Sequence, residues 1–329
     1  MALGEFDLIQ RYFVRPAPRA VVGVGDDCAV LALAPGMQLA VSTDMLVEGR
    51  HFLSTVAPQH LGHKALAVNL SDLAACGAKP LAYTLALSLP RAEAAFLSGF
   101  AEGLHALADA HGIELVGGDT TAGPLNICIT VMGEVPAGQA LLRSGARAGD
   151  ALWVSHPPGG GIGDARLALE VFRGACALPG EGFARVRQAM ECPQPRVALG
   201  QALRGVASAA IDLSDGLMGD LGHVLRRSGP TGAPLGAVIR FDDLPRSAVL
   251  ADQPADLQAQ CLLAGGDDYE LLFTAPADHQ AQVLAAAQAA GVAVRRIGQL
   301  RADPGILVLD GQGQAMPTPW AGFDHFKAA

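Results

Sequence analysis

Four short motifs in the first 120 residues place an aspartate beside glycine, serine or threonine. They are Gly25-Asp26-Asp27, Ser42-Thr43-Asp44, Ser71-Asp72 and Gly117-Gly118-Asp119. Carboxylate and hydroxyl oxygens suit Mg²⁺, which one or two carboxylates usually hold together with substrate phosphates. Converging carboxylates would repel one another by roughly 4 kcal/mol per pair at about 4 Å, at an effective dielectric near 20, so they would need cations. Taken as a set, the motifs predict a site for more than one cation, although each aspartate alone could cap a helix or stabilise a turn.

Two glycine-containing stretches are candidates for contacting phosphate. The loop His156–Gly163 lies between an expected strand and an expected helix, where its backbone N–H groups could face phosphate or simply form a flexible turn. It lacks the lysine of a G-x-x-x-x-G-K-[ST] loop, and Gly23-x-Gly25 lacks the third glycine of a dinucleotide fingerprint. We therefore expect a nucleotide to be held through metal, Arg143 and glycine backbones.

Several polar and aromatic side chains allow two interpretations. His51 could contact a substrate phosphate, yet a lone histidine beside Phe52 is often a packed side chain. The turn Gly266–Glu270 carries three carboxylates and could be an acidic site or a solvated loop. Trp320 and Phe323 could stack on a flat ligand or only hold the tail in place.

Composition limits the class of protein. A chain of 329 residues predicts two domains, and the low charged fraction of 17% beside 50% hydrophobic residues favours a homo-oligomer. The net charge of -9 argues against nucleic-acid binding. Six cysteines without a C-x-x-C pair indicate reduced thiols. An acidic N-terminus and the lack of any apolar run of 18 residues predict a cytoplasmic protein with no membrane segment.

Apolar periodicity predicts alternating helices and strands, which favours an α/β or α+β fold. Helices are expected at 5–13, 58–77, 91–111 and 164–172, and strands at 21–24, 29–33, 38–42, 81–89, 114–116, 127–135 and 151–155. The strand at 38–42 is expected to stop at Ser42, which would place Ser42-Thr43-Asp44 at its tip. A polar, glycine-containing run at 143–150 predicts the domain boundary, giving domains at 1–148 and 149–329.

Motifs along nearly the whole chain resemble, in this order, the thiamine-monophosphate kinase family. That family belongs to the superfamily of ATP-binding enzymes that are similar to aminoimidazole ribonucleotide synthetase. The matching stretches are Gly4–Ile9, Gly25–Asp27, Ser42–Phe52, Lys64–Ala75, Gly117–Thr121, Arg143–Arg147, Asp212–Leu217, Ala264–Phe273 and Gly322–Phe326. The loop at 156–163 departs from the family pattern because it is longer and richer in proline and glycine.

The resemblance implies a two-domain fold. An N-terminal α/β domain would contribute strands to a dimer barrel, and a C-terminal α/β domain would close over a cleft. It further implies direct in-line transfer of the γ-phosphoryl group of ATP to thiamine monophosphate, giving thiamine diphosphate, with several Mg²⁺ ions.

The matched motifs also imply three sets of contacts. Magnesium ligands are implied at Asp27, Ser42, Thr43, Asp44, Asp72, Asp119, Asp212 and Asp215. Nucleotide contacts are implied at Gly118, Asp119, Arg143 and Ser214. Contacts to thiamine or its phosphate are implied at His51, Glu270 and one tail aromatic, either Trp320 or Phe323.

The implied chemistry needs little proton transfer, because the acceptor is already an anionic phosphate. Positioning and charge neutralisation would carry catalysis, so no residue is assigned as a general base, and His51 and Glu270 would orient the substrate. The lack of a cysteine before Cys28 disfavours a selenophosphate synthetase, and the ending Phe326–Ala329 disfavours a hydrogenase-maturation relative. A non-catalytic sensor of nucleotide or thiamine phosphate and a metal-dependent phosphohydrolase remain alternatives.

Overall fold

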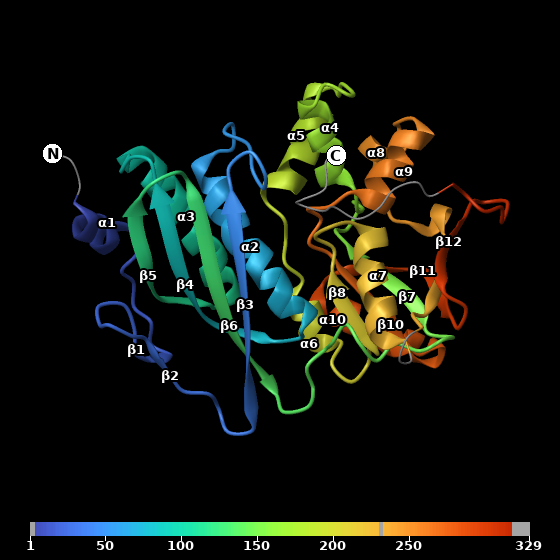
Figure 1. Cartoon of the computed structure of the whole chain (residues 1–329), viewed down its shortest axis with the longest axis horizontal. Helices are drawn as coiled ribbons and strands as arrows, with labels where there is room; N and C mark the ends of the chain where they lie inside the picture. Colours follow the sequence, from blue (N-terminus) through green and yellow to red (C-terminus); the bar gives the residue numbers. More distant parts are fainter. Residues whose placement is uncertain (1–3, 230–232, 318–329) are drawn as a thin grey trace. The chain divides into compact units, whose positions relative to one another are not determined.

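A computed structural model of the chain describes residues 4–229 and 233–317. The chain forms two compact units. The first contains Met1–Leu73 and Ala78–Gly138, and the second contains Ala74–Gly77 and Gln139–Ala329. Strands and helices alternate in both, which confirms the predicted α/β class (Figure 1). A domain boundary between residues 148 and 149 remains a prediction.

The first unit holds a four-stranded sheet in the order β3-β6-β4-β5, covered by helices (Figure 1). Its strands β3, β6 and β4 pair antiparallel, whereas β4 and β5 pair parallel around the intervening helix α3. A separate two-stranded ribbon pairs β1 with β2. Its elements are α1 (Glu5–Tyr12), β1 (Ala20–Val22), β2 (Val30–Leu31), β3 (Met37–Val47), α2 (Pro58–Ala75), β4 (Lys79–Leu89), α3 (Ala94–His111), β5 (Glu114–Ala122) and β6 (Asn126–Pro136).

Two glycines allow α2 and α3 to pack closely on one face of this sheet (Figure 1). A Cβ atom at Gly62 would lie 2.0 Å from the carbonyl oxygen of Phe100, and one at Gly103 would lie 1.8 Å from that of Gln59. Any side chain at either position would overlap the backbone of the other helix. This packing fixes α2, and with it Asp72, against the sheet.

The second unit holds a six-stranded sheet in the order β12-β9-β11-β7-β10-β8. Among the described strands of this sheet, β12 and β9 pair parallel and the other neighbours pair antiparallel. Leu152, Ile211 and Ile239 from this sheet pack with Leu167 and Leu221 of the helices in one buried cluster. Its strands are β7 (Ala151–His156), β8 (Ala209–Asp212), β9 (Gly236–Arg240), β10 (Leu271–Ala275), β11 (Ala293–Arg301) and β12 (Gly305–Leu309). Its helices are α4 (Asp164–Phe172), α5 (Gly180–Glu191), α6 (Val197–Ala202), α7 (Leu217–Ser228), η1 (Phe241–Asp243), α8 (Ala248–Ala251), α9 (Ala255–Ala264), η2 (Ala277–His279) and α10 (Gln280–Ala290).

Two strands extend further than the sequence predicted. The expectation that the strand stops at Ser42 is wrong, because β3 continues to Val47 and pairs with β6 along its whole length. The strand expected at 114–116 continues as β5 through Gly117 and Asp119 to Ala122. The aspartates of both motifs therefore lie within a sheet, where strand alternation fixes the face each one occupies.

Two further expectations concern the chain as a whole. All six cysteines are reduced thiols outside any disulfide, as predicted. Within residues 4–229 and 233–317, no helix combines the length and apolar character needed to cross a membrane.

Candidate active site

The contact between β3 and α2 brings together residues of two predicted motifs. The Ser42 hydroxyl donates a hydrogen bond to Oδ2 of Asp72. The backbone N–H of Asp44 donates to Oδ1 of Asn69 at 3.0 Å, and Nδ2 of Asn69 donates to the Ala65 carbonyl at 3.0 Å. Asn69 is 1% exposed, so its amide is a fixed link between helix and strand. Ser42, Asp44 and Asp72 are thus positioned by one helix–strand contact.

Strand alternation separates other members of the predicted set. The Thr43 hydroxyl pairs with that of Thr130 at 2.8 Å, on the face opposite to Ser42. Asp119 is opposite Ala86 in the pairing of β5 with β4, which places it on the same face as Thr43. β3 and β5 are the two edges of the sheet, three strand spacings or about 14 Å apart. Within a single chain, Asp44 on β3 and Asp119 on β5 therefore lie at opposite edges of the sheet.

Asp27, Gly118 and Asp119 line a common cavity of about 720 Å³ in the first unit. Its other walls include Phe6 and Ile9 of α1, Phe13 just after that helix, and residues of β4. Gly118 has a φ of 147°, and a Cβ atom there would stand 1.9 Å from the carbonyl oxygen of Leu85. Only glycine fits at this position, for reasons of packing within the sheet. The cavity falls within the usual size range of small-ligand sites.

His51 lies in the turn that follows β3. Its ring Nδ1 accepts a hydrogen bond from the backbone N–H of Val47 at 3.0 Å, and the backbone N–H of His51 donates to the Val47 carbonyl at 3.0 Å. An Nδ1 that accepts a hydrogen bond carries no proton, so the neutral ring is protonated at Nε2. The turn therefore fixes the ring orientation and the tautomer of His51.

In the second unit, two motifs are joined by backbone hydrogen bonds. The Asp267 N–H donates to the Ser214 carbonyl at 3.0 Å, and the Tyr269 N–H donates to the Leu213 carbonyl at 2.8 Å. Leu213 in turn donates to the Glu270 carbonyl at 2.8 Å. The segment carrying Ser214 and the turn carrying Glu270 thus form one rigid structure at the ends of β8 and β10.

The turn also holds two residues in a strained conformation. Asp267 and Tyr269 have φ values of 68° and 51°, in the left-handed region that non-glycine residues seldom occupy. Such conformations cost on the order of 1–3 kcal/mol each and concentrate at functional sites. The Tyr269 hydroxyl bonds to Oδ1 of Asp267 at 3.1 Å, which links the two strained residues.

A buried aspartate supports the segment that carries Asp215. Oδ2 of Asp220 accepts the backbone N–H of Asp215 at 3.1 Å, at the start of α7. Burial, and then the charge of Asp215, raise the pKa of Asp220 to about 7, although hydrogen bonds and Arg143 oppose this shift. Arg143, Asp215 and Asp220 therefore share one electrostatic environment, and a cation there would stabilise the two carboxylates.

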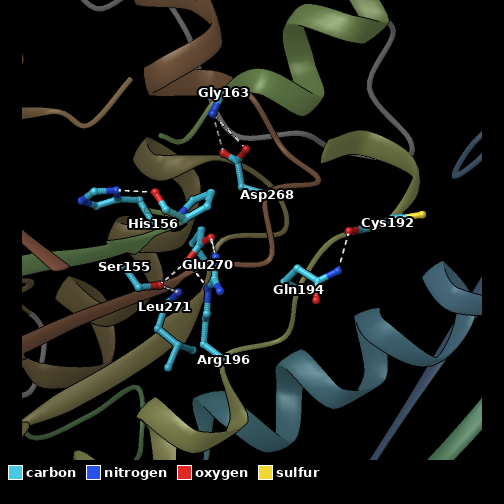
Figure 2. Close-up of polar contacts among 10 residues, drawn as sticks. Ser155, His156, Gly163, Cys192, Gln194, Arg196, Asp268, Glu270 and Leu271 are labelled. Carbon is cyan, nitrogen blue, oxygen red and sulfur yellow. Dashed lines mark hydrogen bonds and ion pairs between the residues drawn. The ribbon is translucent and has the colours of Figure 1, made fainter. Parts of the chain in front are cut away.

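Glu270 is buried and fixed by two side chains from distant segments (Figure 2). Arg196 donates from Nε to Oε2 at 2.7 Å and from Nη2 to Oε1, so the pair is bidentate. The Ser155 hydroxyl also donates to Oε2, and it accepts the N–H of Leu271 at 2.8 Å. The side chains of Arg196 and Glu270 are only 11% and 5% exposed. A charge-assisted pair of this kind is strong and directional.

Internal hydrogen bonds hold the glycine-rich loop His156–Gly163 in place. Asp268 accepts the N–H of Gly163 with both oxygens, at 2.9 and 3.0 Å (Figure 2). The N–H of Ile162 donates to the Pro245 carbonyl at 3.1 Å, and that of Gly160 donates to Pro157 at 2.9 Å. Burial raises the pKa of Asp268 well above its ordinary value. Three N–H groups of the loop are thus engaged within the protein, which favours a structural role for this part of the loop.

The donor set suits magnesium, although the side chains are not gathered into one cluster. Within the described part of the chain, no group of three His, Cys, Asp or Glu side chains is close enough to hold a metal ion. Mg²⁺ usually takes one or two carboxylates and completes its shell with water and phosphate oxygens. Asp72 with the Ser42 hydroxyl, and Asp27 with Asp119 in one cavity, match that requirement.

Asn69, Arg196 and Asp220 were not identified as site residues from the sequence. Asn69 interrupts the apolar run Ala65–Leu70 one turn before Asp72, and Asp220 follows Asp215 by five residues, so local patterns could have indicated both. Arg196 is 74 residues from Glu270, and no local pattern reveals this contact. Trp320 and Phe323 lie outside the described residues.

The chain is similar to a known protein family and to proteins of known function. Residues 25–135 match the model of AIR synthase related protein, N-terminal domain. A thiamine-monophosphate kinase of Salmonella typhimurium is 44% identical over 331 residues, covering 99% of this chain and 99% of that protein. The chain belongs to the thiamine-monophosphate kinase family.

Solved structures of the thiamine-monophosphate kinase family agree with this membership. The thiamine-monophosphate kinase from Stenotrophomonas maltophilia K279a has a TM-score of 0.84 and 42% identity, covering 96% of this chain and 99% of that one. AaThiL complexed with AMPPCP and TMP has a TM-score of 0.75 and 28% identity, covering 90% of this chain and 89% of that one. The likeness extends over both units, so the whole fold is that of the family.

Proposed function

We propose that this chain is an ATP-dependent kinase that converts thiamine monophosphate to thiamine diphosphate. The observation that carries the proposal is the 44% identity to a thiamine-monophosphate kinase along 99% of both chains. A second support is that AaThiL, which has the same fold, was solved with AMPPCP and TMP bound.

The reaction is direct in-line transfer. A phosphate oxygen of thiamine monophosphate attacks the γ-phosphorus of ATP, a new P–O bond forms, and the bond to the bridging oxygen breaks so that ADP leaves. A phosphate monoester has a second pKa near 6, so the acceptor is largely dianionic at pH 7 and needs no strong base. His51 is therefore proposed to orient the substrate and not to accept a proton, because the turn already fixes its ring through the hydrogen bond to Nδ1.

Positioning is the task of the chain's own residues. In the first unit, Asp27 and Asp119 line a cavity that is large enough for part of a nucleotide, and their charges would repel its phosphates unless a cation intervened. Asp72, hydrogen-bonded to Ser42, and Asp44, anchored through Asn69, are the other proposed ligands of that unit. Magnesium, when bound, would neutralise phosphate charge and polarise the transferring group.

The second unit contributes a prearranged set of proposed contacts. Asp212 and Asp215 are the proposed cation ligands, and Ser214 and Arg143 are the proposed nucleotide contacts. The hydrogen bonds between residues 213–215 and 267–270 hold this set in place before substrate binds. Glu270 would orient the thiamine part from a fixed position between Arg196 and Ser155 (Figure 2).

We also propose that the protein is a homodimer formed through the sheet of the first unit. β3 is an edge strand of eleven residues whose backbone could pair with a second copy. Leu39, Val41 and Met45 on this strand are 48%, 55% and 55% exposed. A row of large apolar side chains on a long edge strand is a typical interaction surface.

The deciding assay uses ATP labelled at the γ-phosphate, Mg²⁺, and either thiamine or thiamine monophosphate. Label in thiamine diphosphate that appears only with the monophosphate is the expected result. Release of labelled inorganic phosphate alone would indicate a phosphohydrolase. Binding of the ligands without turnover would indicate a sensor.

A pair of matched variants assigns the activity to the proposed site. Asp44→Asn keeps the backbone link to Asn69 and should abolish turnover with the fold intact, as measured by circular dichroism. Asp109→Asn removes an equal charge from a surface ion pair with Arg15 and should remain active. Near-normal turnover by Asp44→Asn would remove Asp44 from the catalytic site.

A further inference from the structure

Three arginines surround a cavity of about 760 Å³ at one end of the sheet in the second unit. Arg240 comes from the end of β9, and Arg296 and Arg301 come from β11. Neighbouring residues Ile239 and Leu300 are buried in the core cluster, so alternation along the strands directs Arg240 and Arg301 to the other face. The cavity therefore lies on the face of β9 and β11 that is turned away from that core.

This cavity is separate from the proposed catalytic residues of the same unit. Asp212 lies on β8, and β9 is four strands away in the order of the sheet, or about 19 Å. Among the described residues, none of those assigned to the catalytic site lines the cavity. Any ligand that it holds would occupy a second site.

Two of the arginines have donors that the described structure leaves unused. The side chain of Arg296 lines the cavity and forms no hydrogen bond or ion pair with any described residue. Nε of Arg301 is buried without an acceptor in the described part of the chain. Its Nη2 makes only long contacts of 3.3 and 3.5 Å to the carbonyls of Pro304 and Gly305. Arg296 can therefore offer its donors to an anion in the cavity, whereas the buried Nε of Arg301 lies beside Gly236, which does not line the cavity.

The acidic side chains at the cavity do not compete for these donors. Asp243 is already paired with Arg240 at 3.1 Å and with Arg295 at 3.7 Å. Oδ1 of Asp310 accepts the backbone N–H groups of Gln312 and Gln314 at 2.9 and 2.8 Å, within its own turn. With three arginines and two engaged aspartates, the cavity is locally cationic in a chain whose net charge is -9.

We propose that this arginine-lined cavity binds a small organic phosphate. The planar guanidinium group matches phosphate oxygens bidentately, which makes arginine the preferred partner for that group. Val238 and Leu309 add apolar surface at the same cavity, which suits the carbon-containing part of the ligand. The volume is within the range of small-molecule sites.

Binding is tested with inorganic pyrophosphate added to the ¹⁵N-labelled full chain without Mg²⁺, while the amide resonances of Gly298, Gly311 and Gly313 are followed by NMR. These glycines line the cavity and report on it directly. Saturable shifts are expected. Arg296→Gln should weaken the fitted affinity about tenfold or more, as loss of a hydrogen bond to a charged group predicts. Arg296→Lys should recover part of it.

Arg91→Gln is the matched control, because it removes the same charge from an exposed pair with Glu93 in the first unit and should leave the affinity unchanged. Further titrations with ATP and with thiamine diphosphate distinguish nucleotide from thiamine phosphate as the source of the ligand.

Absent shifts, or equal affinity in Arg296→Gln, would overturn the proposal. Shifts that never saturate would mean an adventitious ion only, which also overturns it. Arg296→Gln should turn over thiamine monophosphate at the rate of the unaltered chain. Failure of the binding proposal and failure of the proposed kinase activity are therefore separate results.

Discussion

The ion pair between Arg196 and Glu270 provides a direct test of how the second unit is held together. Replacing Arg196 with methionine keeps an unbranched apolar stem, removes the guanidinium group, and leaves a buried carboxylate with Ser155 as its remaining side-chain donor. Both partners are nearly inaccessible, at 11% and 5% exposure, so solvent cannot replace the lost bonds. Breaking a buried pair on one side typically costs about 3–5 kcal/mol. We expect Arg196→Met to lower the free energy of unfolding by that amount.

The double variant Arg196→Met, Glu270→Met separates stability from function. Removing both charges leaves an apolar contact and a Ser155 hydroxyl that still accepts the N–H of Leu271 but has lost the acceptor for its own proton, so the cost should be only about 1–2 kcal/mol. Its turnover of thiamine monophosphate should nevertheless be low if Glu270 orients the substrate. Urea unfolding and steady-state kinetics measure the two quantities. Arg91→Met, which breaks a pair exposed by 80% and 55%, should change stability by less than about 0.5 kcal/mol. A cost below about 1 kcal/mol for Arg196→Met would refute the reasoning.

Two further predictions concern the first unit. Burial lowers the pKa of His105 below its ordinary value, and its Nε2 contacts the Tyr12 carbonyl at 2.8 Å. Below about pH 6.5, His105 binds a proton more readily in the unfolded chain than in the folded chain. The free energy of unfolding, measured with urea, should therefore fall toward pH 5. It should fall less steeply in His105→Gln. Equal slopes would contradict this. Val41→Lys should convert a dimer into the 33.7 kDa monomer by light scattering, whereas Leu284→Lys, at 46% exposure in the second unit, should remain dimeric.

The sequence predicted helices and strands where apolar periodicity was strong, and it failed where pairing overrides local preference. Aspartate and serine are poor strand formers, so the end of a strand was expected at Ser42. In the structure, β3 is paired with β6 from Met37 to Val47, and the hydroxyl groups of Thr43 and Thr130 meet across the pair. The partner strand is distant in sequence, so the length of β3 could not be deduced locally.

The glycines of Gly117-Gly118-Asp119 were misleading for a related reason. Glycine commonly marks a turn or an interruption of a strand, so β5 was expected to stop before it. Here the carbonyl of Leu85 on β4 lies so close that Gly118 is required within the strand. The residue types of the candidate site follow from their oxygen chemistry, and their roles stay predictions. Their supports, such as Arg196 for Glu270, depend on contacts between segments far apart in the sequence.

The extension of β3 changes the interpretation of Ser42-Thr43-Asp44. At a strand tip the three side chains could converge on one ion. Within a paired strand they alternate, so Ser42 turns to Asp72 on α2, whereas Thr43 meets Thr130 on the opposite face. One short motif therefore supplies oxygen donors to both faces of the sheet. The proposed homodimer would cover the outer edge of β3, because that edge would pair with a second copy. We therefore expect Ser42 and Thr43, which face opposite sides of the sheet, to contact different ligands.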